Sequence, residues 1–289
     1  MLHPIVWVID VSSSTVPQYE ETSPPCVMVE TERLVKSLPE HLPNKPLVEA
    51  IFEIRWGQDG SPDPAYPLIV GRLFERLQTE YPAIEDLPIT AVPAEITVHQ
   101  VRHRFRKAKD GWPLIQVGPG ILTVNDTDGY RWHDFSQRAN GVLPLLYQTH
   151  PTPDALNITS LQLRYVNAIQ FDYSSADVLA FLADKMHVSL SFVPSSRSKH
   201  IVSGDPKSLG VQVVLPIETP AGSLILLVGT GKHKGNNAVV WEIHLRSAQG
   251  EIPTLPTAFS SWLESAHNAV EKWFIEMVEG ELLTQFSRP

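Results

Sequence analysis

Arg102, Arg104 and Arg106 alternate along one polar stretch of the sequence. If this stretch is a β-strand, alternate side chains share a face, and the three guanidinium groups stand in a row about 6–7 Å apart. Such a row can bind phosphates or carboxylates through charge-assisted hydrogen bonds. The alternative is a set of cross-strand ion pairs with Glu49 and Glu53 on a solvated sheet face, each worth only about 0.2–1 kcal/mol.

A second charged set lies on the polar side of other predicted strands: Glu53, Arg164, Glu242, His244 and Arg246. If the two halves of the chain close around a cleft, these side chains would line it, and a few charged groups in an otherwise apolar cleft are typical of small-ligand sites. The alternative is ordinary solvent exposure of one sheet face. The candidate ligand-binding residues are therefore Arg102, Arg104, Arg106, Glu53, Arg164, Glu242 and His244.

Three other motifs resemble functional sites, but their spacing or surroundings do not fit the function. His99 and His103 have the spacing of a zinc-binding helix, but their surroundings alternate like a strand, which would separate them by about 13 Å. The loop Gly229 to Gly235 resembles a phosphate loop, yet it lacks the required spacing and no helix follows, so we expect a mobile basic hairpin. His267 lies at the edge of an apolar helical stripe, where a half-buried histidine bonded to a carbonyl or carboxylate is expected. We predict no catalytic residue, no metal site and no cofactor.

Composition narrows the class of protein. The chain has 289 residues, 43% of them hydrophobic, and a net charge of −9, which argues against general attraction to nucleic acid or anionic membranes. The lone Cys26 excludes an internal disulfide framework and fits a reducing compartment. The longest aliphatic run, Leu224 to Val228, is too short to span a bilayer. These features predict a cytoplasmic protein without membrane association.

The elements that must position the candidate residues follow from hydrophobic periodicity. Strands are expected at Leu47–Trp56, Thr97–Lys107, Pro113–Val117, Ile121–Asn125, Leu161–Phe171, Gly210–Ile217, Leu224–Val228 and Val239–Arg246. Helices are expected from about Asp63 or Tyr66 to Pro82, from an Asp134 cap to Gln148 with a kink or break at Pro144, from Ser175 or Ala176 to Met186, and from Thr257 to Gly280. The last carries the broadest apolar stripe of the chain.

The two halves of the chain repeat one another. Ile54-Arg55-Trp56 corresponds to Leu163-Arg164-Tyr165, and the strand Leu114–Gly120 corresponds to Ile225–Gly231 at nearly the same separation. Chance similarity of short aliphatic strings is the alternative. The repeat predicts an α+β fold of two tandem strand-helix-strand-strand(-strand)-helix units, related by a pseudo-twofold, with antiparallel sheets and helices on one face. Residues 1–44 form a Pro/Ser-rich, partly disordered extension, 45–158 the first repeat and 159–289 the second.

Some strings in this sequence resemble those of a known family. They are PLVEAIFEIRW at Pro46–Trp56, the pair Gln116-Val117-Gly118 and Val124-Asn125, Arg164-Tyr165-Val166-Asn167, and WLxxAH at Trp262–His267. They resemble a sporadically distributed family of uncharacterised prokaryotic proteins, over about Lys45 to Phe286. The family pattern does not extend to residues 1–27, and Met28 offers a second start. The resemblance transfers no site residue; its sporadic distribution implies cargo of mobile defence or toxin–antitoxin modules.

Three functional hypotheses remain open at this point. The first is a non-catalytic protein that binds a small molecule or a protein partner, as the sensing or neutralising member of a defence module. The second is an enzyme acting on nucleotides or nucleic acid, with the arginine row holding phosphates and a nearby histidine transferring protons; nucleic acid is not the favoured partner. The third is a structural subunit of an assembly.

Overall fold

The computed structural model describes residues 42–57, 61–127, 129–190 and 208–288. The predicted extension therefore lies almost wholly outside the described residues. The described chain is α+β and forms a nine-stranded sheet in the order β2-β3-β4-β5-β1-β6-β9-β8-β7, with every neighbouring pair antiparallel. The strands are β1 (Leu47–Trp56), β2 (Ala83–Asp86), β3 (His103–Arg106), β4 (Leu114–Gly118), β5 (Ile121–Asp126), β6 (Ile158–Gln170), β7 (Gly210–Glu218), β8 (Ala221–His233) and β9 (Asn236–Ala248).

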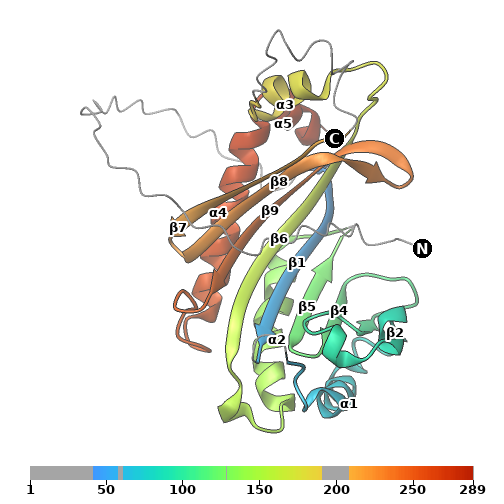
Figure 1. Ribbon diagram of the computed structural model, residues 1–289, viewed down its shortest axis with the longest axis vertical. Helices are drawn as coiled ribbons and strands as arrows, with labels where there is room; N and C mark the ends of the chain where they lie inside the picture. Colours follow the sequence, from blue (N-terminus) through green and yellow to red (C-terminus); the bar gives the residue numbers. More distant parts are fainter. Residues whose placement is uncertain (1–41, 58–60, 128, 191–207, 289) are drawn as a thin grey trace. The chain divides into compact units, whose positions relative to one another are not determined.

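Helices interrupt the strands along the chain. They are α1 (Tyr66–Leu77), α2 (Trp132–Thr149), α3 (Val178–Met186), α4 (Phe259–Val278) and α5 (Glu281–Ser287), with short 3-10 turns η1 (Pro88–Ala91), η2 (Ala94–Ile96) and η3 (Pro153–Ala155). In the view of Figure 1, β1, β6, β8 and β9 pass in front of α2 and α4. None of the described helices is both long and apolar enough to cross a membrane.

One face of the sheet carries the hydrophobic core. On β1 the alternation predicted from sequence is confirmed, since Phe52 and Ile54 are fully buried. The ring of Phe52 lies 5.3 Å from Phe259 and 6.2 Å from Trp262 of α4, and Phe74 of α1 stacks at 6.4 Å on Phe105 of β3. The apolar stripe of α4 is buried as predicted, and burial of apolar surface stabilises the fold. The helices thus cover the face to which Phe52 and Phe105 point.

The opposite face is formed by the alternate residues of the same strands. The register places Glu53 of β1 between Thr123 of β5 and Gln162 of β6. It likewise places Arg164 of β6 opposite His244 of β9. Within the described ranges, the helices that pack on the sheet do so through its other face, so we call this the helix-free face.

Several predicted boundaries are wrong for identifiable reasons. β3 begins at His103 instead of Thr97, because η2 and a positive φ of 58° at His99 turn the chain first. α2 begins at Trp132 and runs unbroken past Pro144; Asp134 lies in its first turn and makes no cap hydrogen bond. The helix tolerates Pro144 because a proline removes a single backbone donor, while Leu143 and Leu146 beside it are buried.

The loop predicted to be a basic hairpin is a hairpin, and its two strands extend the sheet. β8 runs to His233 and β9 starts at Asn236, so the turn consists of Lys234 and Gly235. Both residues have positive φ, 50° and 84°, as a two-residue hairpin with a type I′ turn requires. The short edge strand β2 and the last helix α5 were not predicted; at four and seven residues they are too short for periodicity to reveal.

Candidate functional site

The candidate site lies on the helix-free face, where polar side chains of adjacent strands meet. We call the following residues the polar face: Arg104, Gln116, Thr123, Asn125, Glu49, Glu53, Arg164, Glu242 and His244. They come from β3, β4, β5, β1, β6 and β9, which are neighbours in the sheet. The set therefore spans both halves of the chain.

A chain of hydrogen bonds crosses the first half of the polar face. Arg104 Nε donates to Gln116 Oε1 at 2.6 Å, and Gln116 Nε2 donates to Asn125 Oδ1 at 3.1 Å. Asn125 Nδ2 then donates to Glu49 Oε1 at 2.7 Å. Gln116 and Asn125 are only 7% and 2% exposed. Because buried polar groups are stable only when bonded, this chain holds each amide in one orientation.

A compact charged cluster occupies the second half. His244 Nε2 lies 3.0 Å from Glu242 Oε2, and Arg164 Nη1 lies 3.6 Å from the same oxygen. Burial lowers the pKa of His244, so this ring is neutral at neutral pH and donates its Nε2 proton to the carboxylate. Although burial alone would raise it, the bond from His244 and the charge of Arg164 hold the pKa of Glu242 below its usual value.

Glu49 connects the two halves electrostatically. Burial raises the pKa of its carboxyl, while the hydrogen bond from Asn125 and the charges of Arg164 and Arg104 oppose the rise. Glu242 raises it further. A carboxylate placed between two arginines and beside another carboxylate is sensitive to any further charge brought to this face.

The structure brings together five of the seven sequence candidates: Arg104, Glu53, Arg164, Glu242 and His244. Arg106 lies on the same face nearer the sheet edge, with Nε 2.9 Å from Glu85 Oε2 and Nη1 3.0 Å from Gly111 O. The alternative interpretation of the row, ion pairs with Glu49 and Glu53, does not match the ion pairs found among the described residues. Arg106 instead pairs with Glu85 of the edge strand β2, and Glu53 pairs with Arg55 at 2.6 Å.

Arg102 does not join the row. Its side chain is buried and donates to Thr97 Oγ1 at 2.9 Å and to the carbonyl oxygens of Thr90 and Val92 at 2.7 and 2.8 Å. These bonds fasten the segment that contains η1 and η2. The expectation of three free guanidinium groups is therefore wrong at Arg102, because the irregular backbone before β3 needs donors for its carbonyl groups.

The sequence interpretation missed Gln116, Thr123 and Asn125 as members of the site. They stand in strands that otherwise read as apolar, and all five residues of β4 and all six of β5 are buried. The available signal was the isolated polar residue at alternate positions of an apolar run, which indicates a hydrogen-bonded partner on the neighbouring strand.

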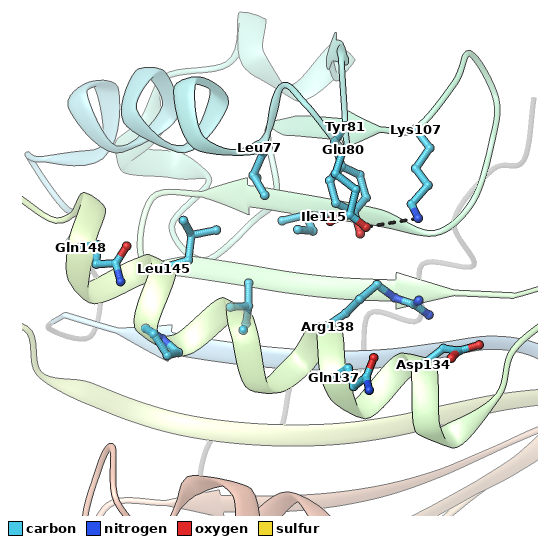
Figure 2. Close-up of a pocket in the computed structure, with 13 residues that line it drawn as sticks. Leu77, Glu80, Tyr81, Lys107, Ile115, Asp134, Gln137, Arg138, Leu145 and Gln148 are labelled. Atoms are coloured by element: carbon cyan, nitrogen blue, oxygen red, sulfur yellow. Dashed lines mark ion pairs between the residues drawn. The ribbon is translucent and has the colours of Figure 1, made fainter.

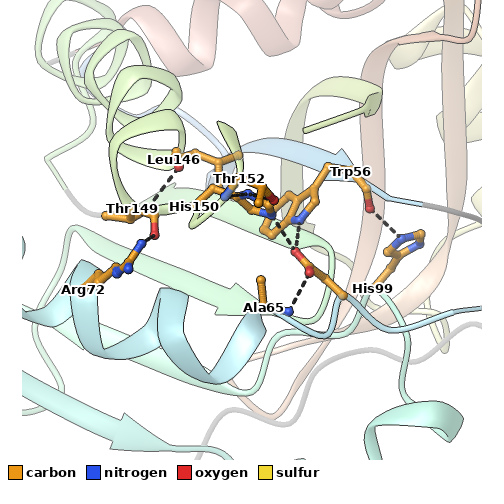
Figure 3. Close-up of polar contacts among 9 residues, drawn as sticks. Trp56, Ala65, Arg72, His99, Leu146, Thr149, His150 and Thr152 are labelled. Carbon is orange, nitrogen blue, oxygen red and sulfur yellow. Dashed lines mark hydrogen bonds and ion pairs between the residues drawn. The ribbon is translucent and has the colours of Figure 1, made fainter. Parts of the chain in front are cut away.

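A buried Asp–His pair lies at another place, near the end of β1 (Figure 3). Asp63 Oδ2 accepts from Trp56 Nε1 at 2.6 Å and from His150 Nε2 at 3.3 Å, and its Oδ1 accepts from the Ala65 amide at 2.8 Å. His150 Nδ1 accepts from the Thr152 amide at 3.1 Å, which places the proton on Nε2. Both ring nitrogens are thus engaged, and the pair ties β1, the start of α1 and the end of α2 together.

A groove of about 670 Å³ lies between α1, α2 and β4 (Figure 2). Leu77, Ile115 and Leu145 contribute apolar lining, and Lys107 and Glu80, on the side opposite α2, form an ion pair of 3.2 Å. Arg138 binds Asp126 beside it. None of the sequence candidates lines this groove. Among the described residues, no group of three or more His, Cys, Asp or Glu side chains is placed to hold a metal ion.

His267 of α4 is part of a buried aromatic cluster. Its Nδ1 lies 3.0 Å from the hydroxyl of Tyr165, whose oxygen lies 2.7 Å from that of Tyr130, and its ring stacks on Trp132 at 3.7 Å. The expected carbonyl or carboxylate partner is thus a tyrosine hydroxyl, with Glu271 Oε2 at 4.0 Å from Nε2. Burial lowers the pKa of His267 to about 4.

This lowered pKa predicts a pH dependence of stability. Unfolding restores an ordinary histidine pKa of about 6.5, so the unfolded chain binds a proton that the folded chain refuses, and stability is lost as pH falls from about 6.5 to 4. His267→Gln cannot take up this proton. We expect the wild type to lose about 3 kcal/mol more than the variant between pH 7 and pH 4, measured by urea unfolding. Parallel pH profiles would contradict this assignment.

Comparison with known proteins adds little to the geometry. No family model matches the chain, and no curated protein matches it. Among solved structures, the chain is similar to the Methanococcus jannaschii TBP, with 11% sequence identity over 78% of this chain and 99% of that chain, at a TM-score of 0.23. A likeness at this TM-score supports no statement about fold or function.

Proposed function

We propose that the protein is a non-catalytic binding protein and that the polar face engages a small molecule or a protein partner. The observation that carries the proposal is a set of bonded polar side chains on the helix-free face, namely the hydrogen-bond chain from Arg104 to Glu49 and the His244–Glu242 pair. Burying charges and amides costs free energy unless each is bonded, and stability alone is served as well by apolar residues. A network that orients polar groups on rigid strands is suited to recognition.

The rigidity of the face supports binding more than group transfer. Some members of the network are fixed by side chains of neighbouring strands, as when Gln116 joins Arg104 to Asn125. Others are fixed within one strand, as His244 and Glu242 are on β9. Glu242 already accepts from His244, so this carboxylate and this imidazole are committed to each other. A preorganised face of this kind lowers the entropic cost of binding.

The duplication inferred from the sequence forms part of the same proposal. We propose that the two halves are copies related by a pseudo-twofold that passes between β1 and β6. The strand order supports it, because outward from this pair the sheet continues as β5, β4, β3 on one side and as β9, β8, β7 on the other. The polar face would then lie across the junction of the repeats. A role as the sensing or neutralising component of a mobile defence module rests on the sequence resemblance.

Ligand retention tests the proposal. The protein, isolated gently from cells that express it naturally, should carry extra mass or a partner chain in native mass spectrometry. The double variant Arg164→Gln/Glu242→Gln should retain at least tenfold less. The matched control is Lys272→Gln/Glu276→Gln, a pair at 4.0 Å on α4 whose side chains are 76% and 63% exposed.

Melting curves must first show that both variants fold. Retention that is equal in the wild type, the polar-face variant and the α4 variant would overturn the proposal. So would loss of the ligand in the α4 variant alone. Either result would place the binding surface elsewhere on the molecule.

A further inference from the structure

We propose that the polar face binds an oxyanion, the carboxylate or phosphate group of its ligand, between Arg104 and Arg164 and over Glu49. This inference rests on the proposed function and names the chemistry of the ligand. It draws on unsatisfied hydrogen-bond donors, on the position of the two arginines in the sheet, and on the carboxyl between them.

The guanidinium group of Arg164 has hydrogen-bond donors without acceptors. Its Nε is buried and has no hydrogen-bond partner among the described residues. Its Nη1 lies 3.6 Å from Glu242 Oε2, an ion-pair distance that is too long for a hydrogen bond. The oxygen of Glu242 meanwhile accepts from His244 at 3.0 Å. A buried guanidinium donor without an acceptor costs about 1–3 kcal/mol. Because Nε is buried, an incoming oxygen would remove that cost only when the side chain turns to expose it.

Arg104 is similarly placed on the other side. Its Nε is taken by Gln116, but its nearest carboxylate, Glu85, lies 3.9 Å from Nη1. Its side chain is 31% exposed, close to the 33% of Arg164. The Nη1 atom of each arginine is thus held only by an ion pair too long for a hydrogen bond. An arginine in this state can still present paired donors to a carboxylate or phosphate.

The sheet places these two arginines on either side of Glu49. β3 and β6 are separated by β4, β5 and β1, which is about 19 Å from strand to strand at the usual spacing. The Nη1 atoms now lie near Glu85 of β2 and Glu242 of β9, so binding one anion between the two arginines requires both side chains to turn toward Glu49. The charges of both arginines act on Glu49, whose Oε1 accepts a hydrogen bond from Asn125 Nδ2. The charged groups that act on Glu49 are Arg164, Arg104 and Glu242.

An anion bound next to the Glu49 carboxylate would repel it, so binding favours the protonated form of Glu49. Burial already raises the pKa of this carboxyl, and an anion at the two arginines would raise it further. By linkage, binding the anion takes up a proton, so its affinity should weaken as pH rises. The variant Glu49→Gln is neutral. It keeps an oxygen that can accept from Asn125 and removes the repulsion between residue 49 and the bound anion.

The experiment uses the full chain with two probes, sulfate for phosphate-type groups and acetate for carboxylates, because both are almost entirely ionised from pH 6 to pH 8. Binding is followed by the NMR signals of arginine Nε–H groups. We expect a saturable shift of the Arg164 signal, an affinity that falls from pH 6 to pH 8, and at least tenfold weaker binding by Arg164→Gln and by Arg104→Gln. Glu49→Gln should bind more tightly at pH 8 and lose the pH dependence. Arg76→Gln on α1 is the matched control.

A response to sulfate alone supports a phosphate-bearing ligand, and a response to acetate alone supports a carboxylate-bearing one. No saturable shift with either probe, or equal affinity in Arg164→Gln and Arg76→Gln, would overturn the inference. Melting curves must show that Glu49→Gln folds. An unchanged affinity in this folded variant, which adds no cation, would also contradict the inference. If the anions fail while ligand retention still depends on Arg164 and Glu242, only this inference falls and the proposed function stands.

Discussion

Trp262→Ala should lower the free energy of unfolding by about 3–5 kcal/mol, the usual cost of removing a large buried aromatic side chain. Trp262 is 3% exposed and lies between α4 and the sheet, with its ring 6.2 Å from Phe52 and 6.3 Å from Phe259. Its Nε1 also donates to Ser247 Oγ at 2.8 Å, and that hydroxyl would lose a partner. Urea unfolding followed by circular dichroism measures the change.

The control for this variant is Lys272→Ala, which alters an exposed side chain of the same helix and should change stability by less than about 0.5 kcal/mol. Trp262→Phe should fall between the two, because it keeps a ring in the core but not the hydrogen bond. A loss below 1 kcal/mol in Trp262→Ala would show that α4 does not anchor the sheet as the contacts indicate.

Asp63→Ala should be the other severe substitution, with a loss of about 3 kcal/mol or more. It removes the acceptor of three donors at once: Trp56 Nε1, His150 Nε2 and the Ala65 amide. Each buried donor left without an acceptor costs about 1–3 kcal/mol. Because the three come from β1, the residue after α2 and the residue before α1, the loss should appear in a single cooperative unfolding transition.

Asp63→Asn retains one acceptor oxygen and should lose less than Asp63→Ala. Asp184→Ala, at an exposed position of α3, serves as the matched control and should remain near the wild type. If Asp63→Ala unfolded at the wild-type urea concentration, the pair with His150 would not be a structural tie, and an acid–base role for it would have to be reconsidered.

What the sequence revealed was mainly local. The alternation of β1 and the stripe of α4 were predicted correctly, because one face of each element is buried and the period of a strand or helix is visible within ten to twenty residues. The sequence also predicted which side of the strands is polar, and five of the seven candidate residues lie on the polar face. These successes share one cause, namely that side-chain direction follows from position within a single element.

What the sequence concealed depends on contacts between distant segments. Arg102 was expected on the surface, but its side chain is buried, where it donates hydrogen bonds to the carbonyl oxygens of Thr90 and Val92. Asp63 and His150 are 87 positions apart, so nothing local indicates their pairing. Gln116 and Asn125 were hidden in apolar strands, since their significance lies in the bonds that they form across the sheet. The order of nine strands likewise arises from long-range pairing.

The location of the bound ligand tests the central claim most directly. Carboxylates can be labelled with a carbodiimide and an amine in the presence and absence of the co-purified ligand or partner, and the labelled positions read by mass spectrometry. If the polar face is the binding surface, protection should concentrate on Glu53 and Glu242, with Glu276 on α4 and Glu80 beside the groove unchanged. Protection of Glu80 or Glu276, with Glu53 and Glu242 labelled equally in both states, would contradict the account.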